Sequence, residues 1–102
     1  MKLTKQTVRQ ALAKVIDPEL QIDIVSLGLI YNVKIEGKNK VVIRMTLTTP
    51  GCPLAPVIDE MVREALYGLV EDTEQDVIVN LTFDPPWVPE MMTEEARLEL
   101  NL

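Results

Sequence analysis

Apolar and polar side chains alternate along the chain with two different periods, and these periods predict its secondary structure. From residue 4 to residue 16 the apolar positions follow the three-and-four spacing of one helical face, and Asp17-Pro18 is expected to end that helix. The strongest helical pattern covers residues 54–69. The stretch TEEARLEL at residues 93–100 predicts a short third helix with Thr93 as its N-cap.

Three other segments alternate with a period of two, which is typical of half-buried strands. They cover residues 29–36, 41–48 and 77–84, and the tetrapeptide EGKN between the first two predicts a hairpin turn at Gly37. Each strand has one apolar face and one largely polar face, so we expect helices to cover the sheet on one side only. The sequence therefore predicts a single domain over residues 1–102. Its fold is expected to be a two-layer α/β domain with a small mixed sheet, in the order α-β-β-α-β-α.

Composition and charge narrow the class of protein. The chain has 47% hydrophobic and 25% charged residues, no apolar run long enough to span a membrane and no hydrophobic stretch near its start of the kind a secretory signal needs, so we expect a cytoplasmic protein. Its net charge of −6 is unevenly distributed, because residues 1–48 carry eight Lys/Arg against four Asp/Glu and residues 49–102 carry two against twelve. The acidic part opposes nucleic-acid binding, which needs a concentrated basic face.

The absence of histidine excludes most hydrolytic mechanisms. A chain without histidine has no Ser-His-Asp triad, no Cys-His pair and none of the histidine-bearing zinc motifs. The single cysteine cannot form an internal disulfide or a four-thiolate metal site within one chain. Any metal held here must therefore take ligands from elsewhere.

That cysteine, Cys52, lies in the stretch TTPGCPLAP, between the second predicted strand and the long helix. The unpaired amides and the positive end of the dipole at a helix N-terminus favour the thiolate, which attacks electrophiles and binds metals. The hydroxyls of Thr48 and Thr49 are placed to donate to such a sulfur or to serve the turn. The alternative is that Cys52 is a small buried apolar residue that fills a gap.

Two further stretches are candidates for the same site. DPELQID holds Asp17, Glu19 and Asp23 with no basic residue among them. Like charges held together in one loop invite a cation or a raised pKa. The favoured alternative is an ordinary loop after the helix, with Asp17 as the cap of a turn. FDPPWVPEMM combines three prolines with the only tryptophan and two methionines, Met91 and Met92. With these side chains exposed it would form a stiff docking surface. The alternative is that Trp87 covers an end of the core.

At these positions the sequence resembles a known family, the small SufT-like and PaaD-like proteins of metal-sulfur cluster biosynthesis. The matching stretches follow in order along almost the whole chain: DPEL at 17–20, IVSLGLIY at 24–31, TTPGCP at 48–53, DPPW at 84–87 and MTEEAR at 92–97. The resemblance implies a two-layer α/β fold, a role in maturing iron-sulfur proteins and a functional thiol at Cys52. It also implies a site around that thiol formed by Asp17, Glu19, Thr48 and Thr49. The chain lacks the extra C-terminal cysteines of the PaaD-like members, so it is more similar to the short SufT-like type.

Three hypotheses follow. In the leading one the protein is a non-enzymatic accessory factor in iron-sulfur cluster assembly, and Cys52 transiently ligates iron or a cluster that is not tightly bound. Its partners are then assembly proteins and apoprotein clients, and it binds neither nucleic acid nor a membrane. The sequence leaves open whether the protein forms a homo-oligomer. The second hypothesis is a protein adaptor that binds clients through its acidic surface and the loop that holds Trp87 and Met91, with Cys52 structural. The third is a thiol enzyme, which the missing histidine and the missing resolving cysteine disfavour.

Overall fold

The computed structural model of this chain describes residues 3–37, 39–48 and 55–100. Its elements are, in chain order, α1 (Lys5–Leu12), β1 (Ile30–Glu36), β2 (Lys40–Met45), α2 (Ala55–Ala65), β3 (Val77–Leu81), the 3-10 helix η1 (Pro89–Met91) and α3 (Glu94–Glu99). Apart from η1, this is the predicted order. None of the helices described is long and apolar enough to cross a membrane.

The three strands form one mixed sheet in the order β1-β2-β3. β1 and β2 are an antiparallel hairpin, and its turn uses the positive φ of Gly37 (+62°), as the sequence predicted. β3 lies parallel to β2, with Val79 opposite Ile43, so the chain must cross over through α2 to reach it. The register between β1 and β2 shifts between Ile30 and Asn32, which marks a bulge at the start of the hairpin.

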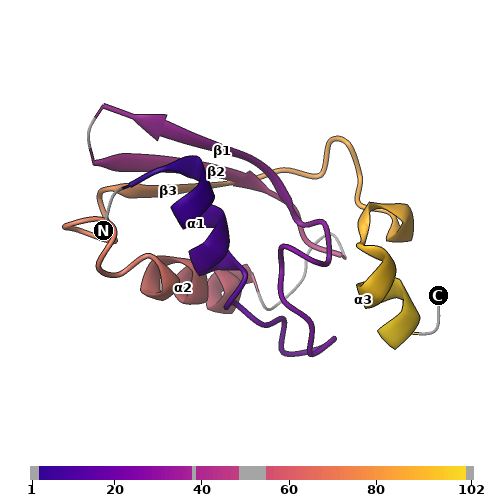
Figure 1. Cartoon of the computed structure of the whole chain (residues 1–102). Coiled ribbons are helices and arrows are strands. Elements are labelled where there is room, and N and C mark those ends of the chain that lie inside the picture. The colour runs from indigo at the N-terminus through magenta and orange to yellow at the C-terminus, as the bar shows by residue number, and fades with distance from the viewer. Residues whose placement is uncertain (1–2, 38, 49–54, 101–102) are drawn as a thin grey trace.

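The helices α1 and α2 lie on the same side of the sheet, which confirms the two-layer α/β fold (Figure 1). The sheet contributes to the core the alternate side chains that the period-two pattern predicted, namely Val33, Val41, Ile43, Met45 and Val77. The helices contribute the apolar stripes of α1 and α2, namely Val8, Leu12, Ile58 and Val62. Burial of these side chains supplies the main stabilisation of the fold.

The predicted bounds of the first two helices are wrong by several residues. α1 ends at Leu12 rather than at residue 16, because the chain then turns through short i→i+3 bonds and pairs with residues 22–24. Asp17 N donates to Ile22 O and Ile24 N donates to Val15 O, so tertiary pairing replaces the last helical turn. α2 similarly ends at Ala65 instead of continuing to residue 69. Val15 and Leu66, just beyond the two helices, remain in the core through turns, whereas Ile16 becomes exposed.

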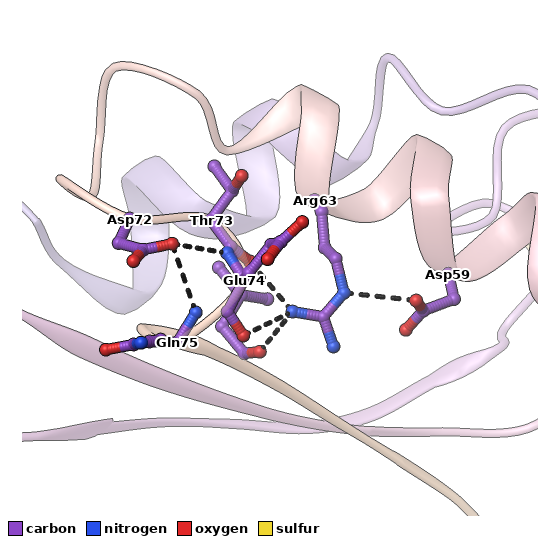
Figure 2. Close-up of polar contacts among 7 residues, drawn as sticks. Asp59, Arg63, Asp72, Thr73, Glu74 and Gln75 are labelled. Carbon is purple, nitrogen blue, oxygen red and sulfur yellow. Dashed lines mark hydrogen bonds and ion pairs between the residues drawn. The ribbon is translucent and has the colours of Figure 1, made fainter.

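One arginine fixes α2 to the loop that precedes β3 (Figure 2). Arg63 Nη1 donates to the carbonyls of Thr73, Glu74 and Val77 at 2.7, 3.1 and 2.6 Å. Its Nε donates to Asp59 one helical turn away at 3.0 Å. The planar guanidinium is suited to this task, because it presents several donors in a fixed geometry.

Candidate functional site

The predicted site residues that the structure describes belong to segments that meet at the end of the sheet where β2 and β3 finish (Figure 1). Three parts of the chain lie close together there (Figure 1). They are the segment between α1 and β1 (residues 13–29), the segment between β3 and α3 (residues 82–93), and α3 itself. Thr48 is half-buried in a bend just after β2. Cys52 and Thr49 lie outside the described residues, so the predictions of a reactive thiol and of its neighbours stay predictions.

Asp17 is a buried carboxylate with a clear local role. Its side chain is only 7% exposed, and its Oδ1 accepts from the amides of Glu19 and Leu20 at 2.8 and 3.1 Å. Gln21 N donates to the carbonyl of Asp17 at 2.8 Å and closes the turn. Asp17 therefore caps this turn, as one of the two sequence interpretations proposed. Glu19 is exposed to solvent.

Asp23 serves the next turn rather than a shared acidic centre. Its Oδ2 accepts from the amide of Ser26 at 2.9 Å. Within the described ranges, no group of three or more carboxylate or thiol side chains is close enough to hold a metal ion. A cation site made by Asp17, Glu19 and Asp23 together is therefore not what this loop forms.

Trp87 holds the chain after β3 against the turn after Asp23. Its indole Nε1 donates to the carbonyl of Leu27 at 2.7 Å, and its ring packs half-buried on the core. Met92 is buried, so it adds nothing to the exposed docking surface that one of the two interpretations described. Met91 is half-buried, and the exposed apolar side chains of this stretch include Phe83 and Val88. The geometry matches the core-covering interpretation of Trp87, and partner binding by Trp87 and Met91 stays a prediction.

Gly28 allows the turn after Asp23 to approach η1 closely. It has a φ of +77°, and a Cβ placed on it would meet the carbonyl carbon of Met91 at 2.7 Å. Glycine is thus required here both for the backbone conformation and for the contact. The signal available in the sequence was the glycine inside SLGLIY, but nothing there identified Met91, far along the chain, as its neighbour.

Tyr31 and Arg44 are site residues that the sequence reasoning assigned only to strand faces. The Tyr31 hydroxyl donates to Pro85 O at 2.8 Å, and Arg44 donates to the carbonyl of Asp84 at 2.8 Å. The Arg44 guanidinium also lies 6.0 Å from the centre of the Tyr31 ring. Together they fix the start of the DPPW stretch to the hairpin. A shallow cavity of about 490 Å³ lies here, lined by Gly28, Ile30, Tyr31, Arg44, Pro85 and Met91.

Comparison with known proteins gives consistent matches over most of the chain. A sequence model of a family described as iron-sulfur cluster assembly protein matches residues 5–79. The Fe-S protein maturation auxiliary factor YitW of Bacillus subtilis is 43% identical over 96% of this chain and 94% of its own length. The auxiliary factor SufT of Staphylococcus aureus is 43% identical over 86% of this chain and 98% of its own.

Solved structures show the same fold. A domain of unknown function from Bacillus anthracis superposes with a TM-score of 0.87 at 38% identity, covering 96% of this chain and 92% of its own. A conserved hypothetical protein from Thermotoga maritima superposes with a TM-score of 0.81 at 46% identity, covering 99% of this chain and 97% of its own.

Proposed function

This chain belongs to the iron-sulfur cluster assembly protein family, and from that premise we propose that it is a cytoplasmic, non-enzymatic accessory factor in the maturation of iron-sulfur proteins. The observation that carries the proposal is the near full-length similarity to proteins named as Fe-S protein maturation auxiliary factors. Longer proteins named iron-sulfur cluster carriers contain a similar segment, for example one of Mycobacterium leprae that is 35% identical over 95% of this chain. Iron or a cluster is thus the cargo of the proposed activity.

In the proposal Cys52 ligates this cargo for a short time, with Asp17, Glu19, Thr48 and Thr49 as its surroundings. A thiolate is the ligand that iron-sulfur clusters prefer. α2 begins at Ala55, three residues after the cysteine, and its first turn holds no acidic residue to oppose a negative sulfur. With one thiol per chain, a partner or a second copy must supply the other ligands, and an incomplete ligand set favours transfer over storage.

The proposed partners are assembly proteins and apoprotein clients. The adaptor hypothesis keeps these partners and removes the ligand role of Cys52. The hydrogen bond between Trp87 and Leu27 O favours a structural role for the indole. The two hypotheses therefore differ in which substitution abolishes maturation.

The test is the anaerobic maturation of a purified apoenzyme whose activity needs a [4Fe-4S] cluster, with iron, sulfide and a thiol in solution. Wild type is expected to accelerate the return of activity, Cys52→Ala to lose that acceleration, and Trp87→Phe, which keeps an aromatic ring in the same place, to retain it. If Cys52→Ala accelerates maturation as well as wild type does, the ligand proposal is wrong. If Trp87→Phe alone fails, the adaptor hypothesis replaces it.

A further inference from the structure

The outer edge of β3 is open over part of its length. β3 is the last strand of the sheet, and no other strand of the described residues pairs with its far side. Asp76 O accepts from Val41 N, and Thr82 N donates to Met45 O, so the even-numbered peptide groups of this stretch face β2. Because peptide groups alternate in direction along a strand, those of Val77, Val79 and Leu81 face outward.

Arg63 covers only the first of these three outward groups. Its Nη1 donates to Val77 O at 2.6 Å, and the same guanidinium binds the loop before the strand (Figure 2). An incoming strand would have to compete with Arg63 for the carbonyl of Val77, so this part of the edge is covered by a charged side chain. The outward groups of Val79 and Leu81 have no such cover among the described residues. The open edge is therefore the C-terminal half of β3.

Apolar side chains become exposed along this same half. Val77 is 1% exposed and belongs to the core, whereas Leu81, on the same face, is 45% exposed, and Phe83 just beyond it is 36% exposed. Side chains two residues apart lie on one face of a strand. An added strand would place its own alternate side chains beside Leu81 and Phe83 and cover both. The free backbone groups of the β3 edge and the exposed apolar side chains beside it both favour binding of an extended peptide chain.

The charge around the edge identifies the chemistry of that occupant. Residues 71–90, which contain β3 and the chain on either side of it, carry six acidic and no basic side chains, namely Glu71, Asp72, Glu74, Asp76, Asp84 and Glu90. The two arginines that lie near β3 are already engaged, because Arg63 binds Asp59 and backbone carbonyls and Arg44 binds the carbonyl of Asp84. Two copies of this edge placed side by side would bring two such acidic segments together, which opposes pairing between copies. We propose that the Val79–Leu81 edge of β3 binds an extended segment of another protein in which apolar residues alternate with lysine or arginine. This inference goes beyond the proposed function and depends only on the β3 edge, with no role for Cys52.

The test uses fluorescently labelled short peptides and measures anisotropy with the full chain. The probe is a peptide of alternating lysine and valine, and a glutamate-valine peptide is the charge control. Two further versions of the probe carry N-methyl groups on all valine amides or on all lysine amides. Strand addition uses only every second amide, so one methylated version is expected to lose binding and the other to keep it.

Two variants locate the site on the protein. Val79→Pro removes an outward amide and no bond to β2, which is the position at which a strand tolerates proline. It is expected to weaken binding of the lysine-valine probe roughly tenfold. The control Leu98→Gln removes a leucine that is 69% exposed on α3 and is expected to change binding by less than about twofold. Circular dichroism verifies the fold of both variants, and if Val79→Pro does not fold, the methylated peptides test the proposal on wild type.

Several results would overturn the proposal. Equal binding of both methylated peptides would show adsorption by charge alone, and equal binding of the glutamate peptide would remove the charge argument. If the lysine-valine probe did not bind, the β3 edge would not be a binding site for this class of ligand. Self-association in analytical ultracentrifugation that Val79→Pro abolishes would make a second copy the occupant.

Discussion

Replacing Gly28 with alanine is predicted to destabilise the fold more than the same change at other glycines with positive φ. Gly28 has a φ of +77°, a region in which a Cβ costs roughly 1–2 kcal/mol. The new Cβ would also lie 2.7 Å from the carbonyl carbon of Met91, and a backbone group cannot turn aside as the end of a long side chain can. Overpacking of this kind adds about 1–3 kcal/mol. We therefore expect Gly28→Ala to lower the free energy of unfolding by about 2–5 kcal/mol.

Gly68→Ala is the matched control. Gly68 has a φ of +95°, but nothing lies within 4 Å of the Cβ that the substitution would add. The control is expected to lose about 1–2 kcal/mol through the backbone conformation alone. The difference between the two variants therefore isolates the contact between the turn that contains Gly28 and η1.

Urea unfolding followed by circular dichroism measures both free energies. Tryptophan fluorescence adds a local signal, because Trp87 is the only tryptophan and its indole binds the carbonyl of Leu27, next to Gly28. The emission of folded Gly28→Ala is expected to shift to the red as the indole becomes more exposed, and that of Gly68→Ala to stay unchanged. If the two variants lose the same free energy within about 0.5 kcal/mol and Trp87 emits as in wild type, the close packing of these segments is refuted.

Two further substitutions test other contacts by the same urea assay. Arg63→Ala is expected to lower the free energy of unfolding by about 1–3 kcal/mol, because three backbone carbonyls lose their donor. Arg63→Lys is expected to recover only part of this loss, because an ammonium group cannot present the planar fork. A loss below about 0.5 kcal/mol in Arg63→Ala would contradict the described contacts. Asp17→Ala is expected to cost about 0.5–2 kcal/mol through its lost turn cap, and Asp17→Asn to cost less because it keeps an acceptor oxygen. Equal losses in the two Asp17 variants would show that the cap is not what the carboxylate contributes.

The sheet and its helical layer could be predicted because their signals are local. The alternation in VVIRM around Ile43 reports which side chains face the core, and the glycine in EGKN reports the turn. The parallel placement of β3 follows from the helix that separates it from β2. The alternation and the hairpin turn depend on neighbours within a few residues of each other, and the crossover depends only on the order of the elements.

Helix ends and the site could be predicted only in part, because distant contacts decide them. The apolar pattern of the first helix continues to Ile16, yet that side chain is 42% exposed, since Val15 pairs with Ile24 and stops the helix early. The role of Trp87 depends on Leu27, which lies 60 residues earlier in the chain. No periodicity in the sequence reports such a pair. The sequence could therefore identify the stretches of the candidate site but not how they pack.

The most direct test of the account is whether the thiol of Cys52 binds iron. Wild type and Cys52→Ala are loaded anaerobically with ferrous iron and sulfide in the presence of a small dithiol that supplies the remaining ligands, and their visible spectra are recorded after gel filtration. Matching circular dichroism spectra of the two proteins ensure that both are folded. We expect protein-bound thiolate-to-iron absorption in wild type and its loss in Cys52→Ala. Equal absorption in the two proteins, or none in wild type, would contradict it.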